Sequence, residues 1–316
     1  MALDQQTQNV LEDIVASGFP GFANLTVEEA RAVLVQMRGL AGPPEPVPTR
    51  DVLIPGQGGE LRLRIYTPDV PAPRPGLVYL HGGGFVCGSV DTIDSPLRAL
   101  SRRAGCSVVS VDYRLAPENR FPAALEDADT AALWTAENAD ELGIDRSRLG
   151  IGGDSCGGGL AAGAARHARE RGSPDFACQV LIYPMLDPSC SSASQRDLGE
   201  GYLVTRQDLV WFWHHYLPAP DAAINPDAAP LLAASFEDLP PALVITAEYD
   251  PLRDEGEEYA AALRAAGVPV ELIRLEGMIH ACFQMAGVID RSAELIDTVA
   301  ALFPRLSRVS ATGTAG

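Results

Sequence analysis

Short apolar segments alternate with longer helical ones along most of this 316-residue chain, and this alternation restricts the fold more than any other feature. The apolar segments span residues 76–80, 107–112, 148–152, 179–183, 242–247 and 270–275, and helical stretches lie near 95–104, 123–140, 156–171, 252–266 and 291–304. Strands that alternate with helices predict a mostly parallel sheet with helices on both faces. Residues 51–55 and 61–67 flank a glycine-rich turn and add an antiparallel hairpin, so we expect about eight strands.

Two segments depart from this pattern. Residues 1–48 are helical in pattern, include the capping-box sequence Thr26-x-x-Glu29, and end in a proline-rich connector. Residues 186–235 contain no strand pattern, but they include a helix-like stretch at 206–217 rich in aromatic residues. We expect these two segments to lie together as a lid. The predicted core then comprises residues 49–185 and 236–309, and residues 310–316 are a predicted disordered tail.

A Gly-x-Ser-x-Gly sequence, from Gly153 to Gly157, stands between a predicted strand and a predicted helix. At a sharp strand-to-helix turn, the serine hydroxyl is lifted above the sheet, and residues two positions away must lack bulk. The helix N-terminus behind the serine favours developing negative charge. A glycine-rich turn without a catalytic role could have the same sequence, but the flanking strand and helix favour Ser155 as a nucleophile.

The sequence His81-Gly-Gly-Gly-Phe85 directly follows the strand at 76–80. Consecutive glycines let the backbone approach a substrate and direct N–H groups toward it, as in an oxyanion hole. The alternatives are a flexible loop or a phosphate-binding loop. The latter requires GxGxxG or a lysine, and the chain has neither, since all 24 basic residues are Arg. The expected oxyanion donors are the amides of Gly83, Gly84 and Cys156.

Because there is no lysine, Ser–Lys catalysis and lysine Schiff bases are excluded, and histidine is the expected base. His280 follows the last predicted strand and precedes the final helix, the only place that gives the order serine, acid, histidine. Of the other histidines, His81 is read as structural and His167 as solvent-facing. His214 and His215 lie in the aromatic helix, where core, lid and substrate contact all stay open.

The expected acid is Asp250, which comes just after the strand at 242–247 and before Pro251. Its main role would be to hold the His280 tautomer and to stabilise the imidazolium, although it can also cap the following helix. Asp254, four residues later, is the alternative, but one helical turn should direct it away.

The net charge of −18 argues against binding to nucleic acid or to anionic membrane surfaces. The six cysteines show no metal-type spacing, which favours reduced thiols in a cytoplasmic protein. The N-terminal sequence has no signal-peptide pattern, and no run of 18 apolar residues predicts a membrane span.

Together these motifs resemble the hormone-sensitive-lipase group of esterases, also called bacterial family IV, with the α/β-hydrolase fold. The resemblance covers about residues 50–305 and rests on HGGGF (81–85), DYRLAPE (112–118), FPAALED (121–127), GDSCGG (153–158), DPLRDEG (250–256) and the GMIH that ends at 280. It implies an α/β-hydrolase fold with a helical cap over the C-terminal edge of the sheet. It also implies hydrolysis of short-to-medium acyl esters without a cofactor or a metal.

Two positions depart from the family pattern. Cys156 stands where the family usually has Ala, and we expect thiol-alkylating reagents to inhibit if they reach it. Gly159 stands where the family often has Asn, which predicts a small packing change.

The sequence thus predicts a carboxylesterase that acts on a small-molecule ester. A related acyl hydrolase, acting on a lactone, carbamate, amide or acetylated natural product, stays open. A non-catalytic receptor of the same fold is disfavoured because all three triad residues are present. Whether the chain forms a homodimer is also open. Expected substrate contacts are Phe85, Tyr183, Trp211, Trp213 and Ile279.

Overall fold

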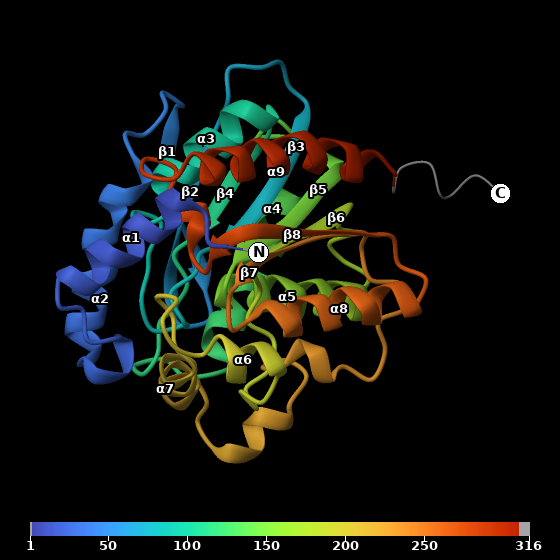
Figure 1. The fold of residues 1–316 in the computed structure, drawn as a ribbon. Helices are drawn as coiled ribbons and strands as arrows, with labels where there is room; N and C mark the ends of the chain where they lie inside the picture. Colours follow the sequence, from blue (N-terminus) through green and yellow to red (C-terminus); the bar gives the residue numbers. More distant parts are fainter. Residues whose placement is uncertain (1, 310–316) are drawn as a thin grey trace.

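The computed structural model describes residues 2–309, whose strands form one eight-stranded sheet in the order β1-β2-β4-β3-β5-β6-β7-β8 (Figure 1). The strands are β1 (Thr49–Gly56), β2 (Gly59–Tyr66), β3 (Arg74–Leu80), β4 (Ser107–Val111), β5 (Ile144–Asp154), β6 (Cys178–Ile182), β7 (Ala242–Tyr249) and β8 (Val270–Ile279). β2 pairs antiparallel with both β1 and β4, and every later pairing is parallel. The predicted mostly parallel sheet is confirmed.

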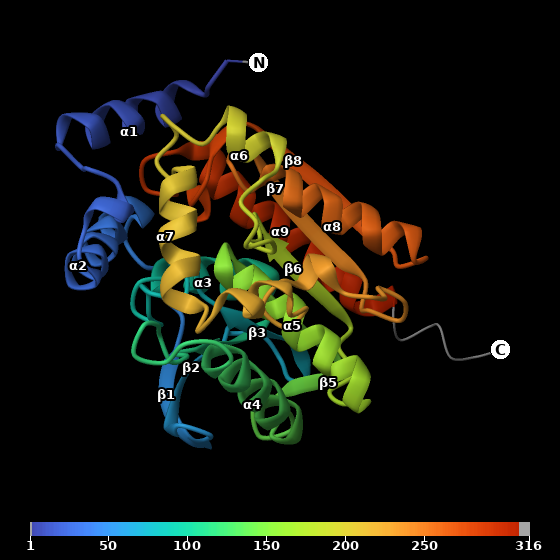
Figure 2. The same cartoon turned by 90° about the horizontal axis from the view of Figure 1, so that it is seen from below.

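Helices cover both faces of this sheet, as the alternation predicts. α3 (Asp94–Ala104) and α9 (Asp290–Val309) pack on one face, and α4 (Ala123–Glu137), α5 (Cys156–Arg171) and α8 (Arg253–Ala265) cover the other (Figures 1 and 2). Every residue of β4 and β6 is buried, which explains why these strands read as continuous apolar runs. Because the strands from β5 to β8 run parallel, the carboxyl ends of β5, β7 and β8 lie at the same edge of the sheet.

The two segments outside the alternation lie beside each other at one end of the molecule, where α2 runs next to α7 (Figure 2). The first contains α1 (Gln5–Ala16) and α2 (Val27–Met37), and the second contains α6 (Ala193–Asp197) and α7 (Arg206–Tyr216). Capping boxes at Thr26 and Thr205 start α2 and α7. Asp208 joins the segments, because its carboxylate accepts the Ala23 N–H at 2.7 Å.

Short 3₁₀ turns complete the chain path, at Phe22–Asn24, Arg38–Ala41, Pro220–Ile224, Pro230–Leu232 and Cys282–Gln284. All six cysteines are buried and unpaired. Within residues 2–309, none of the helices combines the length and the apolar character needed to cross a bilayer. The predicted disordered tail, 310–316, lies outside the described residues.

Candidate active site

Ser155 occupies the tight turn between β5 and α5. Its backbone has φ +56° and ψ −125°, in the left-handed half of the map that a serine rarely adopts. The turn brings Gly157 so close to β3 that a Cβ there would lie 2.0 Å from the Leu80 carbonyl oxygen. Glycine is therefore the residue that this position of the motif accepts, and the strained turn presents the Ser155 hydroxyl at the edge of the sheet.

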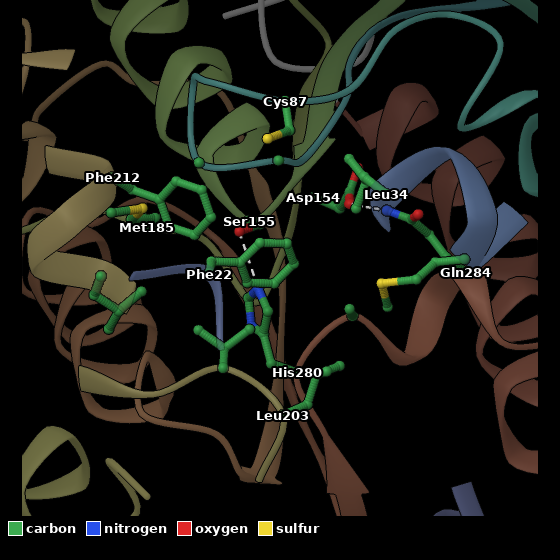
Figure 3. A pocket seen from close by; sticks show the side chains of 16 residues that line it. Phe22, Leu34, Cys87, Asp154, Ser155, Met185, Leu203, Phe212, His280 and Gln284 are labelled. Atoms are coloured by element: carbon green, nitrogen blue, oxygen red, sulfur yellow. Dashed lines mark hydrogen bonds between the residues drawn. The ribbon is translucent and has the colours of Figure 1, made fainter. Parts of the chain in front are cut away.

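The structure brings Ser155, His280 and Asp250 together. His280 Nε2 lies 2.9 Å from Ser155 Oγ (Figure 3). On the other side of the ring, His280 Nδ1 lies 2.8 Å from Asp250 Oδ2. All three side chains are buried. The second carboxylate oxygen of Asp250 accepts the Leu252 N–H at 2.8 Å, so Asp250 also starts the turn before α8. This arrangement can pass a proton from a hydroxyl to an imidazole that a carboxylate orients.

The other histidines lie elsewhere. His81 is buried and stacks on Tyr113 with 4.2 Å between ring centroids. His167 was expected to face solvent, and that expectation is wrong, because its side chain is only 21% exposed and its ring nitrogens contact Asp129 at 2.7 Å and Asp227 at 3.0 Å. These carboxylates come from α4 and from the 186–235 segment. Because both lie far from His167 in the sequence, local sequence patterns do not indicate the contact.

Asp254, the alternative acid, points away from the histidine. Its carboxylate accepts the Ser194 N–H at 2.7 Å and contacts the Arg253 side chain. It therefore attaches α6 to α8, while Asp250 faces His280.

The loop after β3 places Gly83 and Gly84 on the same cavity as Ser155. Gly84 has φ +62°, and a Cβ there would lie 2.1 Å from the Phe212 ring. Only glycine fits, because the position combines a left-handed backbone with close contact to α7. The amide of Cys156, the third expected donor, belongs to the first residue of α5, whose N-terminus favours an anion.

Asp154, next to the nucleophile, is a functional candidate that sequence reasoning missed. Its carboxylate accepts hydrogen bonds from the Tyr79 hydroxyl at 3.0 Å, from the Gly82 N–H at 3.0 Å and from the Gln284 amide at 3.1 Å. Burial raises the pKa of Asp154, and these donors oppose the shift. The side chain thereby ties the glycine loop to the turn that carries Ser155.

An apolar cavity of about 50 Å³ adjoins Ser155 and His280 (Figure 3). The N-terminal segment contributes Phe22, Leu34 and Met37 to its lining. The 186–235 segment contributes Leu203, Val204, Leu209 and Phe212. The core supplies the rest, namely Gly83, Gly84, Cys87, Asp154, Met185, Ala281 and Gln284. The two segments outside the sheet thus both line the cavity next to Ser155.

None of the five expected substrate contacts belongs to this lining, and their role as substrate contacts stays a prediction. Phe85 stacks on Tyr216 with 3.8 Å between ring centroids, and Tyr183 packs against the His280 ring at 4.6 Å. Ile279 is fully buried. For Phe85 and Ile279 an adjacent residue lines the cavity instead, namely Gly84 and His280.

On α7, the lining residues are Leu209 and Phe212, and not the predicted Trp211 and Trp213. Trp213 is buried against Phe85 at 5.2 Å, while Trp211 packs edge-on to His215. The rotation of this helix about its axis decides which aromatic side chain faces Ser155.

The thiol of Cys156 is inaccessible. The residue is 0% exposed, and burial raises the pKa of its thiol to about 12. In the folded chain the alkylation expected from the sequence has no accessible thiolate to act on. Within residues 2–309, no group of three His, Cys, Asp or Glu side chains is arranged to hold a metal ion.

Comparison with known proteins identifies a family and several named relatives for this chain. Residues 77–284 match the family model described as the alpha/beta hydrolase fold. The chain is 42% identical over 279 residues to the carboxylic ester hydrolase LipN of Mycobacterium tuberculosis, covering 85% of this chain and 74% of LipN. It is 42% identical over 252 residues to an ethyl acetate hydrolase of Pseudomonas putida, covering 78% of this chain and 79% of that protein.

A solved structure is similar over almost the whole chain. The hyperthermophilic esterase from the archaeon Pyrobaculum calidifontis superposes with a TM-score of 0.92 at 40% sequence identity. The superposition covers 97% of this chain and 99% of that one.

Proposed function

This chain belongs to the α/β-hydrolase fold family, in its hormone-sensitive-lipase group, and from that premise we propose that it is a carboxylesterase that forms an acyl-enzyme on Ser155. The observation that carries the proposal is the continuous hydrogen-bonded series from Ser155 Oγ through His280 to Asp250 beside an apolar cavity. Two relatives that this chain covers to 74% and 79% of their length are named as ester hydrolases and support the same reaction.

The reaction has two halves. Ser155 Oγ attacks the ester carbonyl carbon while its proton passes to His280 Nε2. The tetrahedral intermediate then collapses, and His280 returns the proton to the departing alcohol. Water attacks the acyl-enzyme, gives a proton to the same nitrogen, and the carboxylic acid leaves as Ser155 regains its proton.

The remaining groups act on charge and orientation. Asp250 accepts the Nδ1–H of His280, which directs Nε2 toward Ser155 and stabilises the imidazolium when it forms. The amides of Gly83, Gly84 and Cys156 are the proposed donors to the oxyanion. Because they are part of the folded backbone, they need little reorganisation as negative charge develops on the substrate oxygen.

Residues 1–48 and 186–235 are the proposed cap over this site. Phe22 and Leu34 from the first, with Leu203 and Phe212 from the second, support this because they line the cavity. An apolar lining around one polar triad favours small, neutral esters over charged ones. The buried, unpaired cysteines support the proposed cytoplasmic location.

The test is turnover of p-nitrophenyl esters from acetate to octanoate by the wild-type chain and by Ser155→Ala. We expect the variant to keep its near-ultraviolet circular dichroism and to lose at least about a thousandfold in kcat. A folded variant that retains most of its turnover would exclude Ser155 as the nucleophile. A matched p-nitroanilide addresses the related acyl chemistries, because amide turnover equal to ester turnover would contradict the ester assignment.

A further inference from the structure

The side chains on either side of Ser155 both bind the backbone of the glycine loop. Asp154 Oδ1 accepts the Gly82 N–H at 3.0 Å. Cys156 Sγ accepts the Phe85 N–H at 3.1 Å, although the two residues are 71 positions apart. The Gly83 and Gly84 amides therefore lie between two attachment points, one on each neighbour of the nucleophile.

The thiol of Cys156 also reaches the start of the loop. Its S–H donates to the His81 carbonyl at 3.9 Å, and the same carbonyl accepts the Tyr113 hydroxyl at 2.7 Å. A thiol is both a weak donor and a weak acceptor, so one side chain contacts both ends of the loop.

The loop needs this support because its backbone is strained. Phe85 has φ +63°, directly after Gly83 at +124° and Gly84 at +62°. A left-handed phenylalanine persists only where its surroundings hold it. The Phe85 ring stacks on Tyr216, and its carbonyl accepts the Ala116 N–H at 2.9 Å. The bond to the Cys156 sulfur is the contact that holds its N–H.

We propose that the thiol of Cys156 is a positioning group for the oxyanion hole, acting through the loop 81–85 and not through contact with the substrate. This inference rests on the proposed function. Phe85 is 2% exposed and Cys156 is 0% exposed, so water does not replace a lost sulfur. The Phe85 N–H would then be buried without an acceptor, and rotation of that region would turn the Gly84 amide away from the oxyanion.

The kinetic test compares Cys156→Ala, which removes donor and acceptor, with Cys156→Ser, which keeps both. Cys178→Ala is the matched control, because Cys178 is equally buried but lies in β6. We expect kcat for a short p-nitrophenyl ester to fall about tenfold in Cys156→Ala with KM unchanged, less than the loss of a whole oxyanion donor causes. Cys178→Ala should stay within about threefold of wild type because it lies far from the loop. Cys156→Ser should recover most of the kcat lost in Cys156→Ala, because a hydroxyl keeps both a donor and an acceptor.

A trifluoromethyl ketone inhibitor gives a second readout, because its serine adduct places an oxyanion in the hole. Its affinity should fall in parallel with kcat in Cys156→Ala and recover in Cys156→Ser. A merely structural role would lower the melting temperature without this parallel. Cys156→Ala with wild-type kcat and ketone affinity, or equal losses in the Ala and Ser variants, would overturn the proposal.

Hydrogen exchange of the amides in residues 81–87 reports on the contact without any turnover. Exchange should accelerate in Cys156→Ala and stay slow in Cys156→Ser, and unchanged exchange would overturn the proposal. A wild-type chain that lacks esterase activity would refute the proposed function, while this exchange pattern would still decide the role of the sulfur. Cys156→Val, which has no donor or acceptor, replaces the Ala variant if that does not fold.

Discussion

Arg31 attaches α2 to the core, and replacing it with alanine should loosen the wall of the cavity. Its Nε donates to the Val86 carbonyl at 2.9 Å and its Nη2 donates to the Ala116 carbonyl at 3.0 Å. The guanidinium also contacts Glu118 twice, at 2.8 and 2.7 Å. Arg31 thus joins α2, which carries the cavity residue Leu34, to Val86 just after the glycine loop and to residues 116–118.

The structure allows these contributions to be separated. The Arg31 and Glu118 side chains are 33% and 57% exposed, so their ion pair contributes only about 0–1 kcal/mol. Hydrogen bonds from a charged group contribute about 1.5–3 kcal/mol each when buried, and less here because water reaches the guanidinium. We therefore expect Arg31→Ala to lower the free energy of unfolding by about 2–3 kcal/mol and Glu118→Ala by about 0.5 kcal/mol.

Urea unfolding followed by tryptophan fluorescence measures both losses, and limited proteolysis reports on any separate release of α2. Arg31→Lys keeps the charge but not the forked geometry of the guanidinium. Its free energy of unfolding should therefore lie closer to that of Arg31→Ala than to that of wild type. Equal losses in Glu118→Ala and Arg31→Ala would refute the reasoning, because the ion pair and not the carbonyl contacts would then hold α2. KM for the ester should rise in Arg31→Ala more than kcat falls.

Three further outcomes follow from the site. Asp250→Asn keeps an oxygen for the Leu252 N–H but presents the wrong partner to His280, so kcat should fall about 10⁴-fold with the fold intact, and a loss below about tenfold would contradict the assigned role. Gly84→Ala should reduce kcat/KM because its Cβ would lie 2.1 Å from the Phe212 ring, and failure of Phe212→Ala to restore part of that loss would argue against this clash. Iodoacetamide at pH 8 should leave Cys156 unmodified in the folded chain, since the thiol is buried with a pKa of about 12, and rapid labelling found by peptide mass spectrometry would contradict that burial.

The sheet could be predicted from the sequence because each strand and helix has a local sequence pattern. Buried parallel strands such as β4 and β6 are continuous apolar runs, and capping boxes at Thr26 and Thr205 mark helix starts. The positions of Ser155, Asp250 and His280 relative to strand ends were readable for the same reason. The structure places these three side chains within hydrogen-bonding distance, and their catalytic roles stay predictions.

The residues that line the cavity could not be predicted from the sequence, because the lining depends on the rotation of helices about their axes and on contacts between distant residues. Aromatic residues at 211, 212 and 213 look alike in sequence, but Phe212 reaches the cavity while Trp211 and Trp213 pack elsewhere. The acids that bind His167 are 38 and 60 residues away, and no local pattern announces them. The sulfur contact of Cys156 is with a backbone N–H, which carries no sequence signal at all.

The most direct test of the central claim is covalent labelling of the wild-type chain with a fluorophosphonate, read by intact and peptide mass spectrometry. The hydrogen-bonded triad predicts one adduct per chain, on the peptide that contains Ser155, and none in the folded Ser155→Ala variant. A folded wild-type chain that takes up no phosphonate, or that carries it on another residue, would contradict Ser155 as the activated nucleophile.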